Sequence, residues 1–500
     1  MAEEPAGAER TRWELIVAFS AIMLATLLAA LDQTIVATAL PRIVGDLRGF
    51  DHLSWVVTAY LVASTITVPL YGKLSDLYGR RRLFLIAISL FLLGSVLCGT
   101  AGSMGQLIAF RALQGLGAGG LIPLSQAAIA DLFPPRERGR YIGFVGAMWA
   151  VAAVAGPLVG GTLTDHVSWR WIFYINLPLG LAALMIVART LPAGSPRRET
   201  KIDWLGAAIL SAGVTLLLLA SVWGGTTYPW GSAEVVGSAV VGVLLLVAFV
   251  LVERRVAEPL LPLPLLRDRV VATASGMSFL VGALLFGITI YVPVYVQGVL
   301  GASATNSGVV LIPHAFGWVL TSFVIGQLIA RSGKYRIYPI AGAISILAGV
   351  TLLSRAGVDT SRTAIAGELA LIGGGMGVTV QTLTVAAQNA VELARVGVVT
   401  GALVFSRSMG GSLAVAGFGA LLANRLTSEL HANLGVDASR VDTKGLLQGG
   451  LHVPPGLEHG TQLALATSMR DVFVVMVPLA VIALVLALRL PERPLRESQH

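Results

Sequence analysis

The sequence predicts an all-α integral membrane protein with fourteen transmembrane helices, arranged as two six-helix bundles plus two inserted helices. Hydrophobic residues make up 55% of the 500 positions and charged residues only 12%, whereas soluble domains carry about 25% charged residues. The mean hydropathy is +0.79. Apolar runs of about 20 residues recur along the chain, and each is long enough to cross a hydrocarbon core of about 30 Å as a helix.

The fourteen expected spans follow one another with short connections, apart from one long outer segment. The first run is too long for a signal-peptide core and leads into charge rather than a small-residue cleavage site, so we expect it to be retained as a helix. In chain order the expected spans are 14–39, 54–71, 83–101, 106–130, 141–163, 171–190, 204–224, 234–252, 270–296, 306–330, 337–356, 363–387, 398–424 and 471–489.

The positions of the basic residues predict the orientation. With the N-terminus inside, the cytoplasmic segments hold most of the 35 Lys and Arg residues, so the positive-inside rule places both termini in the cytoplasm. The same asymmetry explains the net charge of +8, which we do not interpret as a nucleic-acid footprint. We expect a monomer in the inner (cytoplasmic) membrane of a bacterium. The one cysteine, Cys98, is expected to be a buried small hydrophobe.

A charged loop at 72–82 interrupts two apolar runs and contains Gly72, Asp76, Gly79 and Arg80. The glycines permit a tight turn. An ordinary stop-transfer cluster would explain the arginines but neither Asp76 nor the paired glycines. The loop resembles the signature loop of the major facilitator superfamily, which implies the major facilitator fold and a gating role for these four residues.

An internal repeat divides the chain. Residues 326–336 repeat the charged loop with Gly326, Gly333 and Arg336 in register, although Ala330 replaces the acid. The expected divisions are a cytoplasmic N-terminus at 1–13, a first bundle at 14–190, a linker with two inserted helices at 191–269, a second bundle at 270–490 with an outer loop at about 425–470, and a cytoplasmic tail at 491–500. Fourteen spans in this arrangement resemble the 14-helix drug:proton antiporter family.

Two charges inside the first bundle are candidates for proton coupling. Asp32 ends the first span in a segment that resembles the first-helix motif of the 14-helix exporters, and Arg111 with Gln114 in the fourth span resembles the superfamily's proton-transfer motif. Both charges lie at a similar depth, so we expect an ion pair. Gly115 and Gly119 are expected to leave open space beneath the guanidinium. The alternative interpretation is a static buried ion pair, because a carboxylate inside a span needs a partner.

The fifth span carries a stripe of small residues around a proline. Ala152, Gly156 and Gly160 recur every four residues, so a neighbouring helix can approach closely, and Pro157 removes an internal hydrogen bond. Together with Gly146 the segment is similar to the antiporter motif of the superfamily, which implies export. Packing without directional meaning is the alternative.

The remaining candidates are less specific. The repeat aligns Glu368 with Arg111, as a second protonatable group or a hydrated surface carboxylate. A segment from Trp169 to Pro178 matches the 14-helix family and is interpreted as an identifier rather than a binding site. His314 is either a titrating group or a packing histidine, and Arg407 either contacts substrate or binds carbonyls or a carboxylate between helices. The substrate-cavity candidates are Gln114, His314, Gln381 and Arg407.

The resemblance implies a transporter that exchanges inward-moving protons for outward-moving lipophilic, often cationic, compounds. We find no phosphate-binding loop of the GxxxxGK[ST] type, so an ion gradient is the expected energy source, without a cofactor or metal. The alternatives are an exporter of an endogenous lipid or natural product, and a non-transporting membrane sensor or scaffold. An enzyme is not expected, since no Ser-His or metal-ligand cluster is evident in the spans.

Overall fold

The computed structural model describes residues 12–47, 53–191, 203–224, 228–256, 263–302, 304–435 and 456–495, and these are helical apart from turns and one isolated β-bridge. The helices are α1 (Arg12–Leu47), α2 (Leu53–Tyr78), α3 (Arg80–Thr100), α4 (Met104–Leu132), α5 (Pro135–His166), α6 (Trp171–Tyr174), α7 (Asn176–Thr190), α8 (Trp204–Trp223), α9 (Ala233–Glu253), α10 (Leu263–Arg267), α11 (Arg269–Gly298), α12 (Ala304–Ser332), α13 (Ile337–Leu353), α14 (Arg362–Asn389), the 3₁₀ turn η2 (Leu393–Arg395), α15 (Val396–Leu434) and α17 (Glu458–Arg489).

Twelve helices of the described residues are long and apolar enough to cross a membrane. The expected count of fourteen is therefore not confirmed. The expected spans 141–163 and 337–356 correspond to α5, which is not among the twelve, and to α13, which is a shorter apolar helix of 17 residues.

The expected outer loop at about 425–470 is wrong at both ends. The helix α15 continues to Leu434, and α17 already begins at Glu458. Polar residues in these stretches ended the apolar run in the sequence, but they do not end the helix. Residues 436–455 lie outside the described part of the chain.

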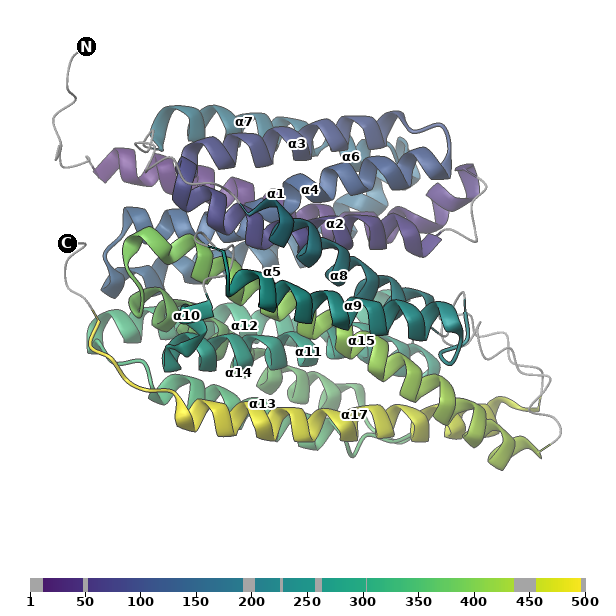
Figure 1. The fold of residues 1–500 in the computed structure, drawn as a ribbon. Helices are drawn as coiled ribbons and strands as arrows, with labels where there is room; N and C mark the ends of the chain where they lie inside the picture. Colours follow the sequence, from purple (N-terminus) through teal and green to yellow (C-terminus); the bar gives the residue numbers. More distant parts are fainter. Residues whose placement is uncertain are drawn as a thin grey trace, which may run out of the picture.

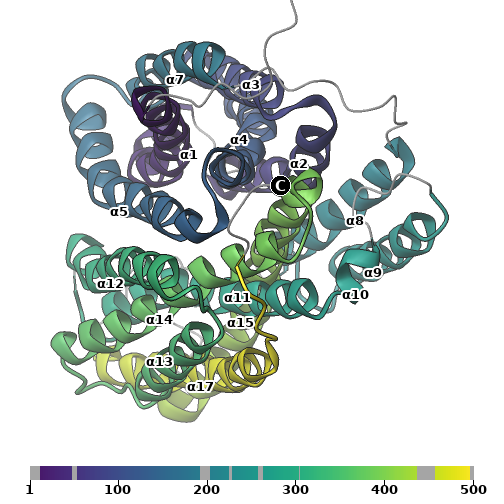
Figure 2. The ribbon, with the colours of Figure 1, turned by 90° about the vertical axis from the view of Figure 1, so that its left-hand side faces the viewer.

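The helices form two groups with their long axes roughly aligned (Figure 1). Viewed along these axes, α1–α7 form one group and α11–α17 the other, and α8 and α9 lie to one side of both (Figure 2). The start of α1 and the end of α17 lie at the same end of the molecule, which we call the termini side. The turns of the internal repeat match, because Gly79 and Gly333 have φ of 88° and 67°, a conformation that favours glycine.

On the termini side, the apolar core runs directly from one group into the other. One cluster of buried residues combines the start of α1 and the end of α4 with the ends of α12 and α14 and the start of α15. Toward the far side, each group has its own cluster. The groups meet at small residues: a Cβ placed on Gly326 of α12 would lie 2.3 Å from the carbonyl oxygen of Gly139 in α5. The structure is therefore closed on the termini side.

The inserted helix α8 contacts both groups. Its residues Leu210, Val214 and Leu217 share a cluster with Met409 of α15 and with partly buried residues of α2 such as Ile66. Phe249 of α9 packs into the same cluster from outside. The inserted pair therefore covers the boundary between α2 and α15.

The segment after α17 crosses the termini side of the second group. The hydroxyl of Tyr335 donates to the Pro491 carbonyl (3.0 Å), Asn389 Nδ2 donates to the Pro494 carbonyl (3.1 Å), and Arg493 forms an ion pair with Asp268 (2.7 Å). This tail ties together the ends of α11, α13 and α14.

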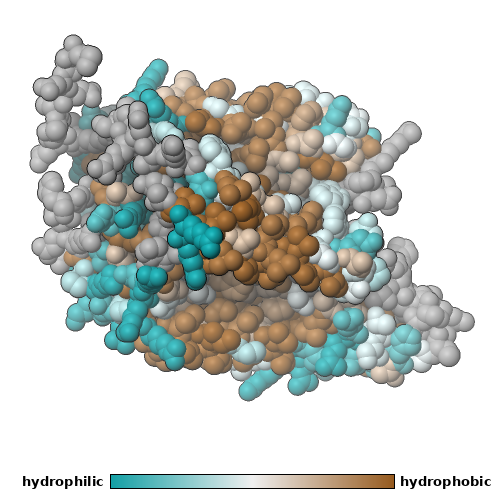
Figure 3. Space-filling view, viewed as in Figure 1, coloured by the Kyte–Doolittle hydropathy of each residue, from teal (hydrophilic) through white to brown (hydrophobic). Residues whose placement is uncertain are grey.

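The surface is apolar over the middle of the molecule, and hydrophilic residues gather toward both ends (Figure 3). The exposed residues of α9 include Val240, Leu244 and Leu251, each at least half exposed. Such a band is the outer surface that a hydrocarbon core requires.

Candidate functional site

Asp32 lies in the interior of the first group, where α1, α3, α4 and α7 enclose it. Its Oδ2 atom is 2.7 Å from Nη1 of Arg111, and both side chains are at most 2% exposed. The expected ion pair between these residues is confirmed. An ion pair removed from water needs further hydrogen bonds to satisfy its remaining donors and acceptors.

Three neutral side chains supply those hydrogen bonds. Gln114 Nε2 donates to Asp32 Oδ1 (2.8 Å), while its Oε1 accepts from Arg111 Nη1 (2.7 Å). Asn176 Nδ2 donates to Asp32 Oδ1 (3.2 Å) and to Ser95 Oγ (3.0 Å). The Asp32 carboxylate thus accepts from an arginine and two amides, and every member of this polar cluster is fully buried or within 1% of it.

Arg111 of α4 is also held by two residues of α2. Its Nε donates to the Val56 carbonyl (3.2 Å), and the guanidinium lies 4.1 Å from the centre of the Tyr60 ring, close enough for a cation–π contact. The expected open space beneath the guanidinium is wrong. A Cβ on Gly115 would lie 2.5 Å from the Tyr60 carbonyl oxygen and one on Gly119 would lie 2.3 Å from that of Ser64, so these glycines allow close packing of α2 on α4.

Cys98 is fully buried and its Sγ lies 3.7 Å from Gln114 Oε1. Its expected burial is confirmed. Ser95 and Asn176 were missed as members of the polar cluster. Asn176 lies in the segment from Trp169 to Pro178, which was interpreted from the sequence only as a family identifier. Ser95 and Asn176 are each a polar residue within an apolar run, and this pattern was the signal that could have identified them.

The charged loop brings Asp76 to the second group. Its carboxylate accepts from the backbone N–H groups of Gly397 (3.1 Å) and Val398 (2.9 Å) in the first turn of α15, where the helix dipole favours a negative charge. Arg80 pairs with Asp76 at 2.5 Å and with Asp131 of α4 at 3.0 Å. The charged loop thus holds the N-terminus of a helix of the other bundle.

Gly72 completes this contact. A Cβ there would lie 2.7 Å from the carbonyl oxygen of Gly397, so a side chain would push α2 away from α15. The backbone of Gly79 takes the left-handed conformation that ends α2. All four residues of the expected gating loop therefore act at one junction of the two groups.

The small-residue stripe of α5 divides between two neighbours. Gly156 faces α1, because a Cβ on it would lie 2.1 Å from Oγ1 of Thr34, and that hydroxyl donates to the Ala152 carbonyl (2.9 Å). Gly146 instead faces Trp318 of α12, at 3.5 Å from its would-be Cβ. Gly160 is buried, and the side chain of Pro157 lies outside the described part.

The candidates of the second group do not come together. Glu368 is half-buried in α14, and one of its carboxylate oxygens is buried without a hydrogen-bond partner. His314 of α12 packs edge to face on Trp318, with ring centres 6.2 Å apart. Gln381 Nε2 donates to the carbonyl of Gly139 across the two groups, so in this state it joins the groups. Arg407 is partly accessible on α15.

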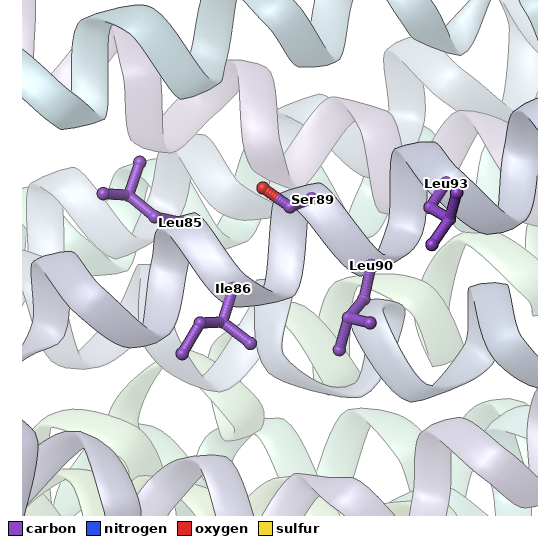
Figure 4. A pocket seen from close by; sticks show the side chains of 5 residues that line it. All are labelled: Leu85, Ile86, Ser89, Leu90 and Leu93. Atoms are coloured by element: carbon purple, nitrogen blue, oxygen red, sulfur yellow. The ribbon is translucent and has the colours of Figure 1, made fainter.

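A shallow hollow on the outside of α3 is not part of this site. It is lined by Leu85, Ile86, Ser89, Leu90 and Leu93 (Figure 4). Ile86 and Leu93 are half exposed, as expected for a surface against lipid. Among the described residues, no three His, Cys, Asp or Glu side chains are grouped so that they could hold a metal ion.

Comparisons with known proteins agree with this arrangement. Residues 22–415 match the family model of the Major Facilitator Superfamily. The chain is 37% identical over 477 residues to Multidrug resistance protein 3 of Bacillus subtilis (strain 168), covering 93% of this chain and 92% of that protein. It is 38% identical over 414 residues to Multidrug transporter protein MdtP of the same organism, covering 82% and 76%.

A solved structure shares the fold. The proton:xylose symporter XylE bound to 6-bromo-6-deoxy-D-glucose aligns with a TM-score of 0.64 and 14% identity over 97% of each chain. Because the family model spans most of the sequence and the aligned relatives cover nearly all of it, the chain belongs to the major facilitator superfamily of membrane transporters.

Proposed function

We propose that this protein is a proton-coupled antiporter that exports lipophilic compounds across the cytoplasmic membrane of a bacterium, with both termini in the cytoplasm. The observation that carries the proposal is the fully buried Asp32 paired with Arg111. A protonatable carboxylate at membrane depth is costly and is a functional site by default. The names of the two Bacillus subtilis relatives support export of drugs.

Protonation of Asp32 changes the force between α1 and α4. The carboxylate attracts the Arg111 guanidinium at 2.7 Å, and arginine keeps its charge at any relevant pH. When Asp32 takes up a proton, this attraction falls to a neutral hydrogen bond, so α4 and α1 are free to shift relative to each other. A conformation in which Arg111 returns to Asp32 expels the proton. Proton binding and conformation are therefore linked.

The shift of α1 can pass to the other bundle through α5. Thr34, two residues beyond Asp32, bonds to the Ala152 carbonyl and packs against Gly156. The same helix meets α12 at Gly139 and Gly143. A movement of α1 at the proton site thus reaches the contact between the two bundles without a gap in packing.

The Asp76 contact serves as the inner gate in this proposal. With the termini in the cytoplasm, the closed side is the cytoplasmic side, and the structure represents a state shut toward the cell interior. Opening requires Asp76 to leave the N–H groups of Gly397 and Val398, at the expense of two charge-assisted hydrogen bonds.

Everted membrane vesicles test the proposal. An acidified lumen should drive a lipophilic dye into vesicles that contain the protein, and a protonophore should abolish the accumulation. Asp32→Asn should abolish gradient-driven transport while the protein stays in the membrane. Asp46→Asn is the matched control, because Asp46 lies on the same helix, is exposed and bonds to Trp169 rather than to the polar cluster. Wild-type transport by Asp32→Asn would contradict the proton-coupling role.

A further inference from the structure

Arg407 is a cation in the first third of α15 for which no described residue supplies a counter-charge. It lies eleven positions after Val396 (407 − 396), or roughly 16 Å along the helix at about 1.5 Å per residue. Among the described residues, no carboxylate pairs with its guanidinium and no acceptor is within hydrogen-bond distance of it. Arg111, in contrast, has a carboxylate, an amide, a carbonyl and an aromatic ring.

The side chain belongs to the face of α15 that looks into the molecule. Thr400 and Leu403 lie seven and four residues earlier, on the same helix face as Arg407. Thr400 accepts a hydrogen bond from Gln388 of α14 (3.1 Å), and Leu403 is part of the cluster that joins the two bundles. Arg407 therefore follows the closed contact along α15, toward the far side.

The backbone of Arg407 packs directly against α11. A Cβ on Gly282 of α11 would lie 1.9 Å from the carbonyl oxygen of Arg407, so the two backbones touch. The adjoining face of α15, with Gly401 and Met409, packs on α2 and α8. The Arg407 side chain is nevertheless partly accessible, so the neighbouring helices do not enclose it on every side.

The other charges within the described spans do not balance Arg407. Asp32 and Arg111 neutralise each other, and Glu368 lies only six positions after the start of α14 at Arg362 (368 − 362), toward the far end. An unpaired arginine within a membrane is costly. Such a residue repels a lipophilic cation and attracts an acid, and its planar fork fits a carboxylate or sulfonate with two hydrogen bonds.

We propose that Arg407 binds the acidic group of the transported compound, so that the substrates are lipophilic organic acids. This inference rests on the proposed export function and specifies its substrate class. The expectation of often cationic compounds came from the family resemblance, whereas the unpaired guanidinium favours the opposite charge. The bound acid would supply the counter-charge that none of the described residues provides.

Two dyes that differ by one charge test the inference: dansyl undecanoic acid and its methyl ester. Binding to the purified wild-type protein, followed by dansyl fluorescence, should favour the acid. Arg407→Gln should weaken binding of the acid by at least about tenfold, as expected for a lost charge-assisted hydrogen bond, and leave the ester unaffected. Arg407→Lys should recover part of the affinity, because it keeps the charge but lacks the fork.

Arg425→Gln is the matched control, since Arg425 lies on the same helix but is 54% exposed and paired with Asp471. Equal affinity of the acid for wild type and Arg407→Gln, with both proteins eluting as one folded species, would overturn the inference. So would a wild-type preference for the ester. These binding measurements need no gradient, so they remain decisive even if vesicle transport fails and the proposed export function with it.

Discussion

Neutralising Asp32 and Arg111 together should cost the protein less stability than the sum of the two single neutralisations. Both side chains are almost completely buried, and removing one partner of a buried ion pair costs about 3–5 kcal/mol because the other charge stays uncompensated. Asp32→Asn leaves the guanidinium with the Val56 carbonyl, Gln114 and the Tyr60 ring. Arg111→Gln leaves a carboxylate with two amide donors.

The double variant Asp32→Asn/Arg111→Gln removes both charges and keeps amides of nearly the same size. We expect its loss of stability to be smaller than the sum of the two single losses by about 2 kcal/mol or more. Residues in direct contact commonly show interaction energies of this size. Denaturant unfolding in detergent gives the three values. Additive losses would show that the two charges do not stabilise each other and would refute the reasoning.

In dye-loaded vesicles neither single variant nor the double variant should transport against a gradient, because none retains a carboxyl group that Arg111 can deprotonate.

Three further predictions concern the contacts around the site. Asp76→Ala should loosen the inner gate, so cysteines introduced there in a Cys98→Ala background should label faster; an unchanged rate would contradict the gate. Gly156→Leu should overpack the contact with α1, at a cost in stability of about 1–3 kcal/mol, and so reduce transport. Gly161→Leu is the control and should not reduce it, since nothing lies within 4 Å of a Cβ there. Equal transport by the two variants would show that the small-residue stripe has no role in transport. Tyr335→Phe should destabilise the tail contact by about 1 kcal/mol, measured by unfolding. Because burial raises the pKa of Tyr335, its hydroxyl keeps its proton below about pH 10, and this loss should be constant over the neutral range; a loss that varies there would contradict it.

The ion pair could be predicted because charges are rare inside apolar runs. Asp32 and Arg111 each stand out in a span, and their depths follow from counting residues along opposite helix directions. Ser95 and Asn176 could not be assigned in the same way. Hydroxyl and amide groups occur in many membrane helices, and only the packing of α3 and α7 around α1 decides which of them reach the carboxylate.

Glycine spacing was harder to interpret. Gly115 and Gly119 indicate a small surface on α4, but the sequence does not tell whether a void or another helix fills it, and α2 fills it here. Gln381 posed a different difficulty. Its bond to Gly139 crosses between the bundles and depends on the conformational state. In the state described here Gln381 lies at the interface between the bundles. The sequence alone does not distinguish that position from one in the substrate cavity.

The inserted helices give the two sides of the transporter unequal freedom. On one side, α5 and α12 meet directly through glycine contacts. If the bundles separate there, only lipid fills the gap. On the other side, α8 packs on α2 and α15 together, so parting those helices slides at least one of them along α8. Because lipid tails are as apolar as the surface of α8, the hydrophobic effect does not hold α8 in place. Only its packing on α2 and α15 would be lost if it moved away. The bundles should therefore pivot about the side that carries α8, and the opposite side becomes the wider entrance from the bilayer.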